Sequence, residues 1–308
     1  MPAITEPAPA KINLALHVRR RRLDGYHDLE TLFAFATDGD LITVEAVEAN
    51  SFTITGPFAA ALLPTPTTNP AKAGAQLGVA PEDAHGSADA ARGAAPWQGN
   101  LVTAAADAFT TAFAPDTHHA ITLEKHLPIA SGIGGGSADA AATLRALVRL
   151  HGIDPTDPRL HEIAAKLGAD VPACLANCTM LGTGKGDTLT TLEGLSGTPL
   201  LLVNPGVAVS TAAVFKTWDG QDRGPIPEGP LLDRARAGRN DLERPALTLA
   251  PIIAEVRTLL DAARGVILSR MSGSGATCFA LFETTQARDA AATAAQACGW
   301  WTLATTMA

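Results

Sequence analysis

Alternating apolar and polar residues near the start of the chain predict a β-strand over residues 10–18. Every second residue from Ile12 to Val18 is apolar, which is the period of a strand with one buried face. Lys11 and Asn13 then project together from the opposite face, since side chains two residues apart in a strand point the same way. The pattern therefore predicts a half-buried strand whose polar face meets solvent.

Alternation of apolar and polar residues predicts the other strands, and apolar residues three or four positions apart predict the helices. Further strands are expected over residues 41–47, 51–55, 120–124, 200–204, 265–269 and 278–282, and helices over 101–113, 140–150, 158–167, 251–264 and 287–298. Strands followed by helices, twice over, predict an α+β protein of two lobes that meet near residues 180–195. We set the domains at 1–182 and 183–308.

Residues 64–99 follow neither pattern. They are rich in Pro, Ala, Gly and Thr, show little periodicity, and form a segment too long for an ordinary loop. The sequence therefore predicts a surface insertion here, partly disordered and with one short helix.

A glycine-rich stretch over residues 127–139 lies between a predicted strand and a predicted helix. Glycine lets the backbone approach a ligand closely, and a helix start presents free N–H groups; both features suit phosphate binding. Taken alone, the stretch supports phosphate binding and a plain tight turn about equally. No lysine follows Gly136, which excludes the P-loop pattern. The sixth position counted from Gly132 is Ser137, which excludes the strict dinucleotide fingerprint.

Composition narrows the class of protein. The 308 residues are 46% hydrophobic and carry a net charge of −8, which indicates a globular chain and argues against general nucleic-acid binding. No apolar run is long enough for a membrane span, and Arg19–Arg22 lacks the apolar segment of an export signal. We expect a cytoplasmic protein whose four cysteines, Cys174, Cys178, Cys278 and Cys298, are buried structural thiols rather than disulfides or zinc ligands.

Three further segments each allow two interpretations. Asp170 lies between the helix-ending Gly168 and Val171-Pro172, in a rigid corner where it would serve as a helix cap or as a positioned general base. Tyr26-His27 follows an Asp-Gly turn and would form a hairpin corner or a wall of a ligand site. Residues 272–275, Ser-Gly-Ser-Gly, join the last two predicted strands as a hairpin turn or as a second loop of N–H donors.

Five segments taken together resemble one family, the GHMP kinases, which includes galactokinase, homoserine kinase, mevalonate kinase and phosphomevalonate kinase. They are Pro-Ala-Lys-Ile-Asn-Leu at 9–14, the loop at 128–138, Met-Ser-Gly-Ser-Gly-Ala at 271–276, Asp-Gly-Tyr-His at 24–27 and Leu-Gly-Ala-Asp-Val-Pro at 167–172. The last two are most similar to a member of the non-mevalonate isoprenoid pathway whose substrate carries a cytidine diphosphate group. The resemblance covers nearly the whole chain outside 64–99.

The resemblance implies a two-lobed fold. Its N-terminal lobe resembles the second domain of ribosomal protein S5, its C-terminal lobe is ferredoxin-like, and the active site lies in the cleft between them. It implies Asp170 as general base and Lys11 as its partner in phosphoryl transfer from ATP.

The resemblance also implies the binding residues. The ATP-binding positions are Asn100, Leu101, Lys125, Pro128, Ile129, Ala130, Ser131, Gly132, Ile133, Gly134, Gly135, Gly136, Ser137 and Ala138. Ser137 is also the candidate ligand for Mg²⁺, most of whose bonds would go to the nucleotide phosphates. Asn13, Tyr26, His27 and Phe215 would line the substrate pocket, with His27 reading the cytosine edge and the rings of Tyr26 and Phe215 sandwiching the base.

Two other functions stay open from the sequence. One is a different GHMP kinase, of the homoserine or mevalonate type, and the other is a non-catalytic nucleotide-binding protein on the same fold. For the function that the resemblance favours, we expect ATP and Mg²⁺ as cofactors and a small-molecule substrate with a cytidine diphosphate group. We also expect no nucleic-acid or membrane partner and a monomer or weak homodimer.

Overall fold

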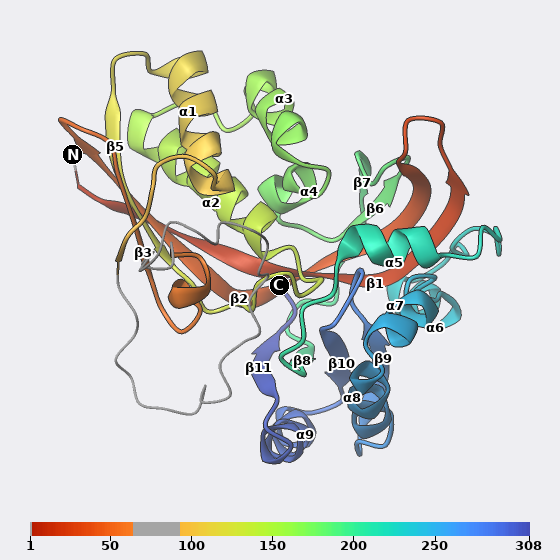
Figure 1. Cartoon of the computed structure of the whole chain (residues 1–308). Coiled ribbons are helices and arrows are strands. Elements are labelled where there is room, and N and C mark those ends of the chain that lie inside the picture. Colours follow the sequence, from red (N-terminus) through yellow and green to blue (C-terminus); the bar gives the residue numbers. More distant parts are fainter. Residues whose placement is uncertain (1, 64–92) are drawn as a thin grey trace, which may run out of the picture.

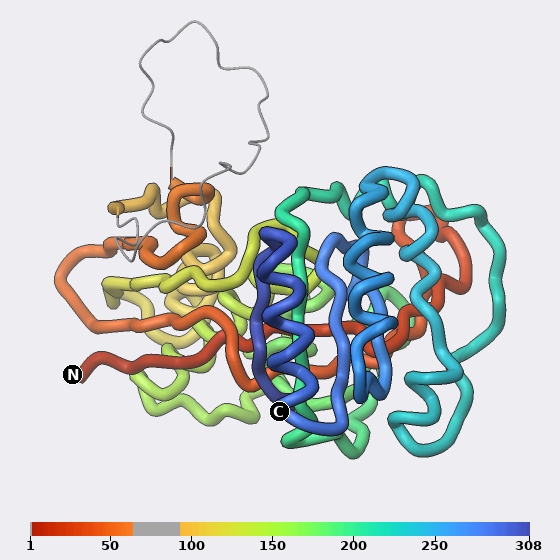
Figure 2. Tube along the Cα trace, turned by 90° about the horizontal axis from the view of Figure 1, so that it is seen from below, coloured from red at the N-terminus to blue at the C-terminus, as the bar shows by residue number. Residues whose placement is uncertain are grey.

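The computed structural model describes residues 2–63 and 93–308, so most of the predicted insertion, residues 64–92, lies outside the described residues. The described chain forms two β-sheets, each covered by its own helices (Figure 1). A long hairpin of the first two strands runs across the width of the molecule (Figure 2), between helices α1–α4 on one side and the second sheet on the other (Figure 1).

The first lobe has a mixed sheet in the order β4-β3-β5-β2-β6-β7, with β1 paired along β2. Its strands are β1 Ile4–Arg21, β2 His27–Val47, β3 Ser51–Thr55, β4 Gly93–Ala94, β5 His118–Glu124, β6 Met180–Thr183 and β7 Thr188–Thr191. Its helices are the short 3-10 turn η1 Ala59–Ala61 and α1 Leu101–Phe113, α2 Gly135–His151, α3 Pro158–Leu167 and α4 Val171–Ala176. Helices α1 to α4 cover one face of this sheet (Figure 1).

The second lobe has an antiparallel sheet in the order β11-β8-β10-β9. Its strands are β8 Pro199–Asn204, β9 Val266–Met271, β10 Cys278–Phe282 and β11 Trp301–Thr306. Its helices are α5 Thr211–Thr217, α6 Leu231–Ala237, α7 Glu243–Leu249, α8 Ile252–Asp261 and α9 Thr285–Ala297. The two-lobed α+β architecture predicted from the sequence is confirmed.

The prediction of a half-buried first strand was wrong. β1 is much longer than residues 10–18, and its central residues are buried on both faces. Ile12 and Leu14 pack with Leu202 and Phe279 of the second sheet, in a core that joins the lobes. Lys11, on the opposite face, is also buried, because the glycine-rich loop covers it.

Local patterns located most elements but misjudged several ends. The helix predicted over 140–150 begins at Gly135, and the strand β11 was missed, so residues 272–275 do not join the last two strands of the chain. The change from the first sheet to the second falls between Thr191 and Pro199, because β7 still pairs with β6. The domain boundary at 182/183 stays a prediction.

The cysteines depart in part from the expected burial. Cys174 and Cys278 are buried and Cys178 is partly buried, but Cys298 is exposed just beyond the end of α9. All four have free thiols. None of the helices in residues 2–63 and 93–308 combines the length and apolar character needed to cross a bilayer.

Two histidines form a hydrogen-bonded pair inside the first lobe. The Nε2 atoms of His119, on β5, and His151, at the end of α2, are 2.9 Å apart. Burial, followed by the charges of His151 and His118, lowers the pKa of His119 to about 4. His119 is therefore neutral at pH 7, and the unfolded chain binds more protons there than the folded chain between pH 6.5 and 4.

The stabilising contribution of His119 should therefore be fully present above pH 6.5 and decline as the pH falls towards 4. We expect His119→Gln to be less stable than the wild type at pH 7 and the difference to shrink by pH 4.5. Urea unfolding across this range measures it. A difference in stability between His119→Gln and the wild type that stays constant from pH 7 to pH 4.5 would contradict the assignment.

Candidate active site

A cleft of about 1030 Å³ opens between the two lobes and gathers most of the predicted site residues. Those that line it are Lys11, Asn13, Tyr26, His27, Asn100, Leu101, Lys125, Pro128, Ile129, Ala130, Ser131, Gly132, Gly134, Gly135, Gly136, Ser137, Asp170 and Phe215. Residues as far apart in the sequence as Lys11 and Phe215 therefore face a common space.

Two residues of the predicted ATP loop do not line the cleft with the others, and their part in ATP binding stays a prediction. Ile133 is buried in the core between the lobes, and Ala138 lies on the buried face of α2, in the first-lobe core. Their backbone groups are already bonded: the Ile133 carbonyl accepts from Lys11 N–H, and Ala138 N–H donates to the Gly134 carbonyl. Apolar side chains in this loop fasten it to the protein instead of facing a ligand.

Lys11 and Asp170 form an ion pair on the floor of the cleft. Lys11 Nζ lies 3.0 Å from Asp170 Oδ2, with the lysine almost fully buried and the carboxylate 37% exposed. Asp170 is at the N-cap position of α4, yet its side chain makes no capping hydrogen bond. The cap interpretation of Asp170 therefore fails, and its carboxylate is free to meet both Lys11 and a ligand.

Asn13 connects this pair to the second lobe. Lys11 Nζ donates to Asn13 Oδ1 at 3.1 Å, and Asn13 Nδ2 donates to Thr31 Oγ1 at 2.7 Å. The backbone N–H of Asn13 donates to Ser272 Oγ, whose hydroxyl donates in turn to the Gly132 carbonyl at 3.0 Å. The loop at 272–275 therefore supports the glycine-rich loop through a direct hydrogen bond.

The glycine-rich loop passes closer to its neighbours than any side chain would allow. A Cβ at Gly132 would lie 2.5 Å from the Ser272 carbonyl oxygen, and one at Gly134 would lie 2.9 Å from Lys11 Cε. Gly134 has φ of +67° and is the N-cap of α2, so the loop leads directly into that helix. The first N–H groups of α2 and its positive dipole end face the cleft, which suits a phosphate group.

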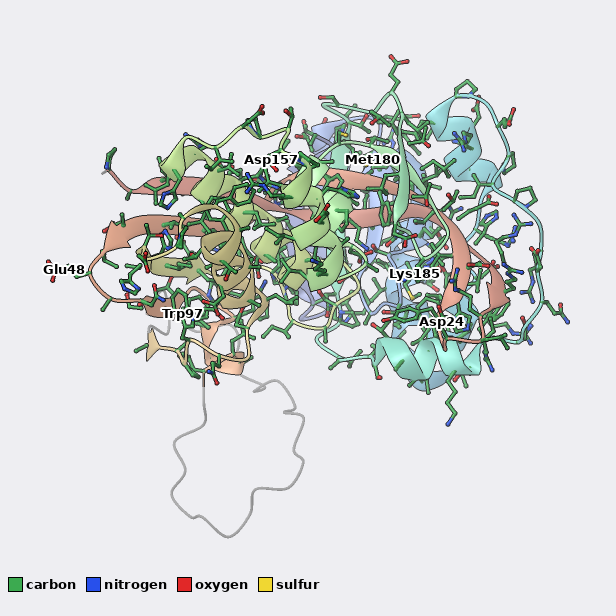
Figure 3. All side chains as sticks on the ribbon, turned by 90° about the horizontal axis from the view of Figure 1, so that it is seen from above. Asp24, Glu48, Trp97, Asp157, Met180 and Lys185 are labelled. Atoms are coloured by element: carbon green, nitrogen blue, oxygen red, sulfur yellow. The ribbon has the colours of Figure 1, made fainter. Side chains whose placement is uncertain are left out.

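The opposite end of the cleft is aromatic. The ring of His27 lies 4.9 Å from that of Phe215, on α5, and Tyr26 is more than half exposed with Lys185 Nζ 5.0 Å above its ring. Figure 3 shows Lys185 and Asp24, near Tyr26 in the sequence, at this end of the molecule. Burial and the nearby Arg21 lower the pKa of His27, so its imidazole is neutral and able to exchange hydrogen bonds with an uncharged base.

Asn100 and Leu101 line a further part of the cleft, and Asn100 also has a structural role. The side-chain oxygen of Asn100 accepts from Val102 N–H at 2.9 Å and caps α1. Leu101 follows it with 37% exposure and offers an apolar surface to the cleft. Among the described residues there is no group of three or more His, Cys, Asp or Glu side chains arranged to hold a metal ion.

Sequence reasoning missed Asp40 and Asp139. Lys125 Nζ donates to Asp40 Oδ2 at 2.5 Å and to Asp139 Oδ2 at 2.7 Å, with all three side chains buried. Burial lowers the pKa of Lys125, but the two carboxylates more than offset this, so the net shift is upward. Burial raises the pKa of Asp139 above its usual value, although the charge of Lys125 lowers it. The sequence contained one indication of this role, because Asp139 is an acidic residue on a helix face otherwise made largely of alanine.

Comparison with known proteins agrees with this geometry. Residues 100–177 match the family model for the GHMP kinases N terminal domain, and residues 230–299 match that for the GHMP kinases C terminal domain. A protein of Rhizorhabdus wittichii named 4-diphosphocytidyl-2-C-methyl-D-erythritol kinase is 52% identical, over 97% of this chain and 93% of its own length. One of Novosphingobium aromaticivorans with the same name is 47% identical, over 98% and 92%.

This chain belongs to the GHMP kinase family. A crystal structure of 4-(cytidine 5'-diphospho)-2C-methyl-D-erythritol kinase is 34% identical to it, with a TM-score of 0.73 and 98% of both chains covered. A homoserine kinase from Cytophaga hutchinsonii has a TM-score of 0.68, with 99% of this chain and 94% of its own covered, but 17% identity supports the fold alone. The resemblance drawn from the sequence motifs, including the most similar member, is confirmed.

Two glycines with left-handed backbones separate the effect of strain from the effect of crowding in this GHMP kinase. Gly134 and Gly152 cap opposite ends of α2 with φ of +67° and +63°, but a Cβ at Gly152 would meet nothing within 4 Å. Alanine at either position should lower the unfolding free energy by about 1–2 kcal/mol through backbone strain. Only Gly134→Ala should also displace Lys11, and we expect it to reduce turnover about 10- to 100-fold. Equal turnover of the two variants would show that the loop does not position Lys11.

Proposed function

We propose that this chain transfers the γ-phosphoryl group of ATP to the 2-hydroxyl of 4-diphosphocytidyl-2-C-methyl-D-erythritol, a step of non-mevalonate isoprenoid precursor synthesis. The Lys11–Asp170 ion pair carries the proposal, because it lies in one cleft with a helix N-terminus on one side and aromatic rings on the other. Relatives 42–52% identical over nearly the full chain bear the name of this kinase.

The chemistry follows from the charges at this point of the cleft. The partly exposed carboxylate of Asp170 accepts the proton of the substrate hydroxyl as its oxygen attacks the γ-phosphorus. Lys11, held by Asn13 as well as by Asp170, orients that carboxylate and neutralises charge that develops on the transferred group. Phosphoryl transfer depends mainly on alignment and charge stabilisation, so a base, a lysine and a cradle of N–H groups are sufficient.

The aromatic end supports a substrate that carries a base. Tyr26 and Phe215 provide surfaces for stacking cytosine, and the neutral His27 beside Phe215 is the residue we propose for hydrogen bonds to its edge. Stacking accepts any base, so the preference for cytosine rests on His27. Homoserine and mevalonate have no base to stack, which makes a kinase of either type the weaker proposal. A non-catalytic nucleotide-binding protein would have no use for the Lys11–Asp170 pair.

The nucleotide would occupy the remaining part of the cleft. We propose that its triphosphate meets the loop from Pro128 to Ser137 and that its adenine lies towards Asn100 and Leu101. Mg²⁺ fits this arrangement without a carboxylate cluster, since it retains several waters and binds mainly to nucleotide phosphates. Ser137, at the first turn of α2, is the side chain we propose to contact it; when bound, the ion neutralises phosphate charge.

We further propose a cytoplasmic enzyme that is a monomer or weak homodimer and binds no nucleic acid. The net charge of −8 supports the last of these points.

The direct test is release of ADP by the purified chain with ATP, Mg²⁺ and each of three acceptors: 4-diphosphocytidyl-2-C-methyl-D-erythritol, homoserine and mevalonate. We expect kcat/KM for the cytidine-bearing acceptor to exceed the other two at least 1000-fold, since they lack the group that fills the aromatic end. Faster turnover of homoserine or mevalonate would refute the assignment of substrate, and no turnover of any acceptor would favour a non-catalytic role.

Replacing the proposed base should abolish chemistry and spare binding. We expect Asp170→Asn to lower kcat by about 100- to 10,000-fold, the range that general-base catalysis contributes, with KM values little changed. Asp157→Asn provides the matched control: Asp157 caps the neighbouring helix α3 outside the cleft, and asparagine caps a helix as well as aspartate, so this variant should keep its kcat. Near-normal kcat in Asp170→Asn would remove Asp170 as the base.

A further inference from the structure

Three charged side chains are buried together directly behind the glycine-rich loop. Lys125 lies between Asp40 and Asp139, bonded to one oxygen of each, and each of the three side chains is at most 4% exposed. The backbone of the loop rests on this group without an intervening side chain, since a Cβ at Gly135 would lie 3.1 Å from Lys125 Nζ. We call Asp40, Lys125 and Asp139 the buried triad.

The triad connects the two ends of the loop. Asp40 Oδ1, from β2, accepts hydrogen bonds from the backbone N–H groups of His126 at 2.6 Å and Leu127 at 2.8 Å, where the loop begins. Lys125, one residue earlier, reaches Asp139 in the second turn of α2, after the loop has ended. The segment that faces the cleft is therefore closed at its base by ionic hydrogen bonds, which are stronger and more directional than neutral ones.

Stability alone does not account for such an arrangement. Burying charges is costly, and replacing buried ion pairs by apolar side chains of similar size often stabilises a protein. Here two carboxylates surround one ammonium group, and Asp139 Oδ1 has no hydrogen-bond partner in the described structure. The side chain of Asp139 is thus held by its other oxygen alone, and that bond links the start of α2 to Lys125, the residue that follows β5.

We infer that Asp40, Lys125 and Asp139 are positioning residues that set the spacing of the loop's N–H groups for the phosphates of a nucleotide; this rests on the proposed function only in taking ATP as that nucleotide. Lys125 acts through the loop, because its two short bonds to carboxylates already balance its charge. The triad therefore controls the binding of the phosphates and leaves recognition of the base and of the second substrate unaffected.

The test compares ATP with adenosine, which has the same base and ribose but no phosphate to place in the loop. Dissociation constants for both are measured by calorimetry on the full-length chain. We expect Asp139→Ala to weaken ATP binding at least tenfold and adenosine binding less than twofold. Asp139→Asn keeps an oxygen that accepts from Lys125, so it should restore ATP affinity to within threefold of the wild type.

Glu6→Ala is the matched control, because Glu6 is a buried carboxylate that pairs with Arg145 and Arg149 further along α2. It should leave both affinities within twofold. Should Asp139→Ala fail to fold, Asp139→Leu keeps the volume without the charge and is expected to show the same selective loss. Equal weakening of ATP and adenosine, an unchanged ATP affinity, or the same loss in Glu6→Ala would each overturn the inference.

Calorimetry separates this inference from the proposed function. A wild-type chain that binds ATP but phosphorylates none of the acceptors would refute the kinase assignment and still allow the test of the triad. Where the wild type does turn over, the variants should raise KM for ATP and leave KM for the cytidine-bearing acceptor within twofold. A rise in both KM values would indicate general loosening of the cleft and contradict a positioning role.

Discussion

The ammonium group of Lys11 lies inside the protein and must be paired, because an isolated buried charge is very costly. Its partners are Asp170 and Asn13, and meeting them requires that β1, α4 and the second lobe all come together at one point. β1 is held between the two sheets, so the pair cannot move independently of either lobe. The cleft, the loop above Lys11 and the exposed carboxylate of Asp170 all depend on this placement. Because the charge of Lys11 is paired with Asp170, the partly exposed carboxylate of Asp170 lies where the proposed reaction needs a base.

Much of this could be predicted from the sequence. Helix α1 with its Asn100 cap, helix α3 with its Asp157-Pro158 start, and strand β10 follow directly from periodicity and capping residues. The chemistry was found differently, from five short motifs whose residues are far apart in the sequence but meet in the cleft. Periodicity contributed only that Lys11 and Asn13 share a face, and the family resemblance contributed the pairing with Asp170.

What the sequence did not reveal depends on packing between distant segments. Alternation in β1 indicated a solvated face, but that face lies under the glycine-rich loop, whose own conformation depends on the contact. Ile133 and Ala138 were grouped with the loop by motif, although their apolar side chains turn into the cores. Asp40 and Asp139 meet only through Lys125, across 99 residues of sequence, so no local pattern could pair them. β11 is a short terminal strand whose pairing with β8 is likewise a long-range contact.

The most direct measurement is the crystal structure of this chain with a non-hydrolysable ATP analogue and 4-diphosphocytidyl-2-C-methyl-D-erythritol. We predict that the 2-hydroxyl oxygen lies within hydrogen-bond distance of both the Asp170 carboxylate and Lys11 Nζ, in line with the γ-phosphorus. The triphosphate should lie along residues 128–137, with cytosine between Tyr26 and Phe215. A complex in which the substrate hydroxyl points away from Asp170, or in which the triphosphate lies outside the loop, would contradict the account.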